Sequence, residues 1–193
     1  MTRVAERERV TKETNISARV DLDGEGRASI ELPLPFFTHM IESFVRYSGM
    51  DVTLRGSGDI DVDAHHLVED TGLVLGAAVS DALGERAGIR RFGDAVAPLD
   101  ESLVRCAIDY GRRPHVVWAM DALRGRINEF DVSLLAEFVK GYAQNAGATV
   151  HVDCIRGDNL HHVAEAAFKA MGLATREAFA VFGSAIPSTK GTL

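Results

Sequence analysis

The 193-residue sequence predicts an α+β fold that arose by internal duplication, with two β-α-β halves packed as one body. The main observation is a repeated cluster of two adjacent histidines and a glutamate, HHLVED from His65 and HHVAEA from His161. The residues upstream repeat as well, since an offset of 98 residues brings Gly49 onto Gly147 with matching apolar positions around them. No stretch rich in Pro, Ser or Gly separates the halves, so we expect them to share one core.

The first half, residues 1–93, shows both helical and strand periodicity. Apolar residues follow helical spacing from Phe37 to Val45, and Gly49 is a plausible helix stop. The segment MDVTL (50–54) then alternates like a strand, and EGRASIEL (25–32) predicts a strand before the helix. A long apolar-patterned helix is expected from Leu67 to Leu83, directly after the first histidine block.

The second half, residues 94–193, repeats this order. Helical spacing from Leu135 to Tyr142 precedes Gly147, and the strand-like segment ATVHV (148–152) follows. ESLVRCAIDY (101–110) predicts a strand before this unit, and a last helix is expected from about Val163 to Phe182. The two halves meet near residues 91–98.

Composition and charge narrow the class of protein. The chain is 46% hydrophobic and 25% charged, which is typical of a soluble globular domain, and its net charge of −7 argues against a nucleic-acid partner. The first residues lack an apolar signal region and no run reaches membrane-spanning length, so we expect a cytoplasmic protein without a membrane partner. Cys106 and Cys154 form no motif and are expected to be buried free thiols.

The repeated block indicates metal chemistry. On a helix, residues i and i+4 share a face, so His65 and Glu69 can hold one ion, as can His161 and Glu165. The neighbouring histidine is rotated by about 100°, which suits a second ion better than the same one. Imidazole with carboxylate and no thiolate favours Mn, Fe, Zn or Ni. If the halves pack around a pseudo-twofold axis, each ion can draw ligands from both.

A structural interpretation competes with each of these assignments. One such block alone is as well explained by a solvated helix start, and only its repetition makes that interpretation weak. His39, on an apolar-patterned helix, would by itself be a satisfied core histidine. His115 has no repeat partner and no nearby carboxylate in the sequence, so we take it as structural.

The ordered set of motifs resembles the imidazoleglycerol-phosphate dehydratase family. The resemblance runs from TKETNI (11–16) through FFTHM, DAHHLVEDTGLVLG, GIRRFGDAVAPLDESL, GRRP and GDNLHHVAEAAFKA to PSTKG (187–191). It implies a fold like ribosomal protein S5 domain 2, with left-handed β-α-β crossovers. It also implies loss of water from imidazole-glycerol phosphate to give imidazole-acetol phosphate in histidine biosynthesis, through a dimanganese-bound imidazolate.

The resemblance further implies two Mn²⁺ ions per active site and a homo-oligomer of 24 subunits with sites at subunit contacts. The implied metal ligands are His39, His65, His66, Glu69, His161, His162 and Glu165. The implied substrate-binding residues are Glu13, His39, Arg91, Arg113, Lys169, Ser188, Thr189 and Lys190. Glu13 and Glu165 are the implied acid/base residues. In isolation Glu13 would be an exposed strand residue, and the STKG segment a loose tail.

Three positions depart from the family pattern. The family usually has Gln where this chain has Ser43, and His where it has Tyr47, and both lie near the implied substrate site. The family also usually supplies a histidine ligand on the first helix of the second half. The repeat places Glu137 there, opposite His39, whereas His151 falls on the following strand. Because carboxylate is a competent manganese ligand, we predict that Glu137 binds metal and His151 does not.

Two other functions fit the same residues. A dinuclear metallohydrolase would use similar ligands to activate water, with a bridging carboxylate. A metal-dependent assembly module would use the ions to join subunits, and would not need the arginines and lysine of the implied phosphate site.

Overall fold

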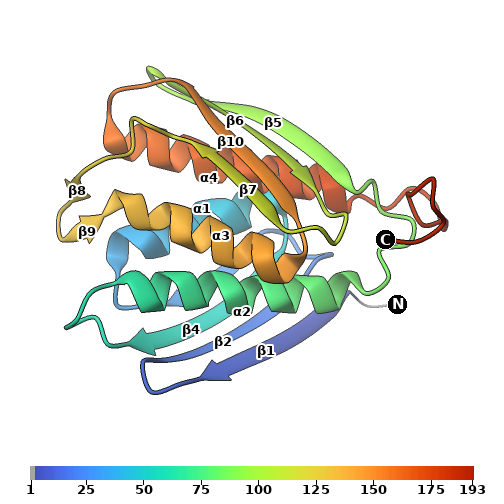
Figure 1. Ribbon diagram of the computed structural model, residues 1–193, viewed down its shortest axis with the longest axis horizontal. Coiled ribbons are helices and arrows are strands. Elements are labelled where there is room, and N and C mark those ends of the chain that lie inside the picture. Colours follow the sequence, from blue (N-terminus) through green and yellow to red (C-terminus); the bar gives the residue numbers. More distant parts are fainter. Residues whose placement is uncertain (1–2) are drawn as a thin grey trace.

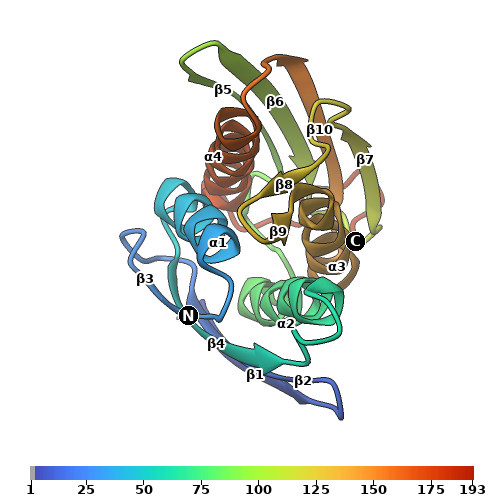
Figure 2. The same cartoon turned by 90° about the vertical axis from the view of Figure 1, so that its left-hand side faces the viewer.

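The computed structural model describes residues 3–193 and shows two four-stranded sheets with four helices between them (Figures 1 and 2). Each sheet and its helices come from one half of the chain, except that β5 of the second half begins at Phe92, two residues before the expected boundary. The predicted α+β fold with an internal duplication is confirmed. Across the described residues, no helix has both the length and the apolar character needed to cross a membrane.

The first half forms a sheet in the order β1-β2-β4-β3. In it, β3 and β4 are parallel neighbours, and a helix connects them in the sequence. Its elements are β1 (Val4–Val10), β2 (Thr14–Asp21), β3 (Ala28–Glu31), α1 (Pro35–Ser48), β4 (Asp51–Gly58) and α2 (His65–Leu83). The second half repeats the pattern in the order β5-β6-β10-β7, with β7 parallel to β10. Its elements are β5 (Phe92–Leu99), β6 (Ser102–Asp109), β7 (His115–Ala119), α3 (Leu135–Ala146), β10 (Thr149–Arg156) and α4 (Leu160–Phe179).

A small insertion distinguishes the second half. Between β7 and α3 the chain forms the short hairpin β8 (Arg126–Ile127) and β9 (Phe130–Asp131), followed by the 3-10 turn η1 (Val132–Leu134). Phe130 from this hairpin stacks on Phe37 of α1, with ring centroids 6.0 Å apart. The insertion therefore closes over the end of the helix layer.

The helix ends follow the predicted signals in most places. Gly49 and Gly147 end α1 and α3 in the left-handed conformation, at φ of 78° and 61°, as the repeat predicted. The two long helices begin earlier than predicted, because each histidine block forms the first turn of its helix. The last helix ends at Phe179, earlier than predicted, because Ala180 is extended and its carbonyl accepts from the Arg90 amide.

The two halves are joined through their helices. The first helix of each half packs against the second helix of the other, so α1 lies on α4 and α2 lies on α3 (Figure 2). A Cβ on Gly76 would lie 2.4 Å from the Tyr142 carbonyl oxygen, and one on Gly172 would lie 2.7 Å from that of Phe44. The repeat pairs Gly76 with Gly172 and Phe44 with Tyr142. The contacts therefore obey the predicted pseudo-twofold symmetry, and only glycine permits them.

The core is centred on this helix layer. Phe44 and Tyr142 are fully buried and meet edge to face, with ring centroids 5.5 Å apart. Of the two cysteines, Cys106 is buried as predicted, whereas Cys154 is only half-buried near the end of β10.

Candidate active site

Three predicted ligands converge at one end of the helix layer. His39 on α1 and His161 on α4 both direct Nε2 at Oε2 of Glu165, at 3.3 and 3.2 Å. One ligand atom from each residue lies within 4.8 Å of the others. Because α1 packs on α4, the cluster draws on both halves of the chain, and its spacing is suited to one metal ion.

The second oxygen of Glu165 faces a lysine. Lys169, one turn further along α4, donates to Oε1 of Glu165 at 2.9 Å, and its side chain is 16% exposed. Burial alone would raise the pKa of Glu165, but the hydrogen bond and charge of Lys169, with His39, outweigh it and lower the pKa. Glu165 is therefore an ionised carboxylate shared between two imidazoles and an ammonium group.

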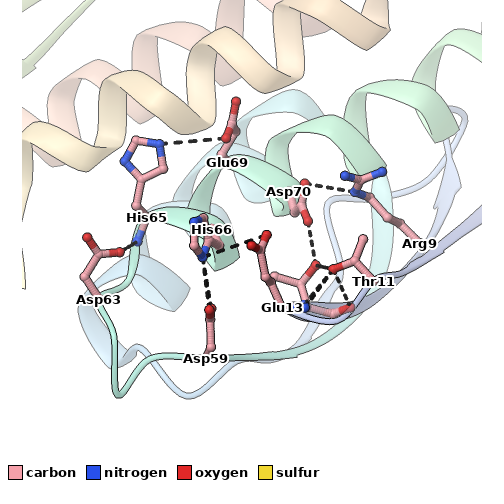
Figure 3. A network of polar contacts seen from close by, with 10 residues as sticks. Arg9, Thr11, Glu13, Asp59, Asp63, His65, His66, Glu69 and Asp70 are labelled. Atoms are coloured by element: carbon pink, nitrogen blue, oxygen red, sulfur yellow. Dashed lines mark hydrogen bonds and ion pairs between the residues drawn. The ribbon is translucent and has the colours of Figure 1, made fainter.

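The first histidine block divides between two directions, as its spacing predicted (Figure 3). His65 lies along the α2 face toward Glu69, with Nε2 and Oε2 3.7 Å apart. His66 turns toward the sheet, where Nδ1 is 3.1 Å from Asp59 and 4.0 Å from Oε2 of Glu13. The hydrogen bond with Asp59 raises the pKa of His66, and the charge of Glu13 adds to it. Glu13, in the turn between β1 and β2, therefore lies near the start of α2, at the end of the molecule that holds the candidate metal ligands, which we call the metal end.

The second block also divides between two directions, but its second histidine meets a carboxylate from a different loop. His162 turns away from the cluster, and its Nδ1 lies 2.8 Å from Oε2 of Glu101 in the β5–β6 turn. Its Nε2 lies 3.9 Å from Asp100. The hydrogen bonds from His162 and Ser102 lower the pKa of Glu101 to about 2, and the same contact with Glu101 raises the pKa of His162.

Sequence reasoning missed Asp59 and Glu101 as partners of these histidines. Glu101 was present in the motif GIRRFGDAVAPLDESL, but nothing in its spacing linked it to His162, which is 61 residues away. Asp59 lies seven residues before His66, in the GDIDVDAHH stretch. The signal that could have found them is that each is an acidic residue in a loop next to a strand, near the end of the sheet where the histidine-bearing helix begins.

Glu137 lies on α3, the counterpart of α1, and its half-buried side chain accepts from Lys140 at 2.8 Å. The helix at this point rests on α2, since a Cβ on Gly141 would lie 2.6 Å from the Glu69 carbonyl oxygen. Glu137 precedes Gly141 by one turn, which puts it beside the part of α2 that carries His65 and Glu69. His151 is exposed on β10, with its ring centroid 6.5 Å from that of His115 on β7.

Five of the predicted substrate-binding residues gather at the opposite end, whereas Lys169 lies beside Glu165. Arg91, Arg113, Ser188, Thr189 and Lys190 line one open hollow of about 870 Å³. Arg91 is fixed there by two hydrogen bonds to Asp109, at 2.6 and 2.9 Å, and by one to the Pro187 carbonyl oxygen at 2.9 Å. Its backbone N–H donates to the carbonyl oxygen of Ala178, near the end of α4.

The two ends are far apart within one chain. The candidate metal cluster uses the first turns of α4, whereas the tail residues 187–193, which include several that line the hollow, follow its last turn, where Figure 1 shows the C-terminal segment. At 1.5 Å per residue a 20-residue helix separates them by roughly 30 Å. The structure therefore brings His39, His161 and Glu165 together at one end of α4, with Lys169 beside them, and the other predicted substrate-binding cations together beyond the other end.

Comparison with known proteins decides the family. The family model described as imidazoleglycerol-phosphate dehydratase matches residues 33–175. The chain is 47% identical to the imidazoleglycerol-phosphate dehydratase of Phenylobacterium zucineum, with both chains covered in full, and 48% identical to that of Hydrogenobaculum over 96% of each chain. The chain belongs to the imidazoleglycerol-phosphate dehydratase family. It is a hydro-lyase of histidine biosynthesis.

Solved structures agree on the fold. The imidazoleglycerol-phosphate dehydratase of Pyrococcus furiosus, solved in complex with (S)-C348, superposes with a TM-score of 0.85 at 36% identity, over 97% of this chain and 100% of that one. The Staphylococcus aureus imidazoleglycerol-phosphate dehydratase superposes with a TM-score of 0.84 at 28% identity, over 93% and 99%. The matched segment 33–175 contains both histidine blocks, while Glu13 and the tail lie outside it.

The two departures from the dehydratase pattern on α1 have different surroundings. Ser43 is buried, at 8% exposure, on the face of α1 that packs into the core. Tyr47 is partly exposed, and the ammonium nitrogen of Lys169 lies 5.7 Å from its ring centroid, within cation–π range. The tyrosine therefore contacts the same lysine that pairs with Glu165.

Removing the carboxylate at Glu101 is expected to lower the pKa of His162. In metal-free protein the charge of Glu101 makes His162 keep its proton to higher pH, so Glu101→Gln lets the proton leave at lower pH. NMR titration of the His162 ring measures this directly. Glu129→Gln, on the exposed β8–β9 turn, is the matched control and leaves the titration unchanged. An unaltered His162 titration in Glu101→Gln contradicts the assignment.

Proposed function

We propose that the protein converts imidazole-glycerol phosphate to imidazole-acetol phosphate and water, using two Mn²⁺ ions per active site. The observation that carries the proposal is the cluster of His39, His161 and Glu165, assembled from both halves of the duplicated chain. Two imidazoles with one carboxylate suit a divalent ion such as Mn, Fe, Zn or Ni, and the resemblance to the family favours Mn²⁺ among them.

The donor chemistry supports two ions instead of one. His39, His161 and Glu165 would hold one, and His65 and Glu69 with Glu137 would contribute to the other. His66 and His162 turn away from these groups, toward Asp59 and Glu101, which suits bonds to ions shared with other chains. When bound, the ions would act as Lewis acids that favour the deprotonated form of the substrate ring.

The protein's own residues account for the proton movements. The reaction removes the ring-adjacent hydroxyl as water and takes a proton from the neighbouring carbon, giving an enol that becomes the ketone when carbon is reprotonated. Glu13 is 57% exposed, so its carboxylate is free to take the carbon proton and return it. Glu165, kept ionised beside Lys169, is the second proposed acid/base group.

The hollow beyond the last turn of α4 is the proposed binding site for the substrate phosphate. Arg91 and Arg113 offer planar forks of donors, and Lys190 adds a point charge with the hydroxyls of Ser188 and Thr189. Because this hollow and the metal cluster are separated by the length of α4, one chain cannot hold one substrate molecule with both. We therefore propose a homo-oligomer, of 24 subunits by family resemblance, in which one subunit supplies the metals and another the phosphate site.

The direct test is an assay of the purified protein with Mn²⁺ and imidazole-glycerol phosphate. We expect imidazole-acetol phosphate as product, and a loss of kcat/KM of at least about 100-fold in His161→Ala, since a metal ligand is removed. His115→Ala, an exposed histidine on β7, is the matched control and retains activity. Release of inorganic phosphate without the acetol product would favour a metallohydrolase instead.

A mixing experiment tests the shared site. His161→Ala damages the metal end and Arg113→Ala damages the phosphate end, so each assembly is expected to be inactive alone. Co-assembly of the two variants after metal removal and Mn²⁺ addition is expected to restore activity, because some sites then combine an intact metal end with an intact phosphate end. Activity that stays absent in verified mixed particles would place the whole site within one chain.

The role of Glu137 is tested by its metal content. Glu137→Ala is expected to lose about half of the bound Mn²⁺ and most activity, because one of two ions loses a carboxylate ligand. Glu137→His is expected to retain both ions, since imidazole also binds Mn²⁺. His151→Ala, a histidine on the exposed face of β10, serves as control. Normal Mn²⁺ content in Glu137→Ala, with loss in His151→Ala, would reverse the assignment.

A further inference from the structure

A buried carboxylate beside the metal-ligand candidates has no role in the proposed chemistry. Asp70 follows Glu69 directly on α2 and is 7% exposed. Its side chain points away from Glu69 and toward the turn between β1 and β2 (Figure 3). There Oδ2 accepts from the Thr14 hydroxyl at 2.5 Å, and Oδ1 accepts from Nε of Arg9 at 2.9 Å.

The turn that Asp70 binds is the one that carries Glu13. Oγ1 of Thr11 accepts from the backbone N–H groups of Glu13 and Thr14, at 3.0 and 2.9 Å. The Glu13 carbonyl oxygen accepts from the Asp59 amide at 3.0 Å. The backbone of Glu13 is thereby held on both sides, while its carboxylate makes no hydrogen bond within the described residues and lies 4.0 Å from Nδ1 of His66.

The second half of the duplication has no carboxylate at the position that corresponds to Asp70. The repeat places Ala166 on α4 where α2 has Asp70. The β5–β6 turn is held instead by its own carboxylate, because Glu101 binds His162 at 2.8 Å and accepts from Ser102 at 2.7 Å. A carboxylate engaged in this way is a poor acceptor for a substrate proton. The buried aspartate lets the first half fix its turn without using Glu13.

We infer that Asp70 is a positioning residue for Glu13, acting through Thr14 and Arg9 to fix the β1–β2 turn over the metal end. The inference rests on the proposed function, because it takes Glu13 as an acid/base group. Asp70 contacts neither substrate nor metal in this role. A hydroxyl bonded to a buried carboxylate is a strong, directional contact, so losing it loosens the turn without removing any ligand.

The decisive variant is Thr14→Val, which replaces the hydroxyl with a methyl group of similar size. We expect kcat to fall roughly 10- to 100-fold, because misplacement of an acid/base group by about 1 Å has effects of this size. KM and bound Mn²⁺ are expected to stay within about twofold of the unaltered protein. Thr14→Ser restores the hydroxyl and is expected to recover most of kcat, and Asp70→Ala is expected to match Thr14→Val.

The matched control is Asp81→Asn. Asp81 pairs with Arg7, so it also joins α2 to β1, but it lies near the far end of the helix. Its loss is expected to leave kcat unchanged. If Asp81→Asn lowers kcat as much as Thr14→Val does, the effect belongs to strand–helix packing in general and the inference is overturned.

Two further readouts separate positioning from stability. In a Glu13→Gln background, adding Thr14→Val is expected to cause no further loss of kcat, because both changes remove the same function. Amide hydrogen exchange at residues 11–14 is expected to quicken in Thr14→Val, while the β5–β6 turn stays unchanged. Additive losses of kcat, or unchanged exchange, would overturn the inference.

An unaltered protein without dehydratase activity would instead contradict the proposed function. The hydrogen-exchange experiment would still test whether Thr14 and Asp70 hold the turn.

Discussion

The close crossing of helices from the two halves is the constraint on which the rest of the structure depends. At Gly76 and Gly172 the backbones come near enough that any side chain would collide with the opposite helix. This approach places the first turns of α1 and α4 side by side, and those of α2 and α3 likewise. His39 can then meet His161 and Glu165, although 122 residues separate the two histidines in sequence. This candidate metal-binding cluster is a consequence of how the core is packed.

Duplication supplies the framework, and the two copies have diverged within it. The second histidine of each block contacts a carboxylate, but the loops that supply it differ, since Asp59 follows β4 and Glu101 lies in the β5–β6 turn. The supporting residues differ, since Lys169 on α4 corresponds to Leu73 on α2. A symmetric scaffold thus carries an asymmetric set of charges, which a reaction needs if one carboxylate is to hold metal and another to move protons.

The two ends of α4 carry different kinds of polar side chain. Imidazoles and carboxylates occupy the start of this helix, while the arginines and lysine of the hollow lie beyond its end. In the proposed homo-oligomer, the two groups would meet where the end of α4 in one chain lies beside the start of α4 in another, and this would couple the proposed chemistry to assembly.

The sequence by itself determined the duplication, the helix stops at Gly49 and Gly147, and the division of each histidine block between two directions. These features are local, because helical periodicity, glycine conformation and the 100° rotation between neighbours act within a few residues. Only the tertiary structure decided that His162 meets Glu101 and that Asp70 holds the turn carrying Glu13. Those contacts join residues 56 or more positions apart. Local patterns fix which face of an element a side chain occupies, but only the packing of elements decides which residue from another element it meets.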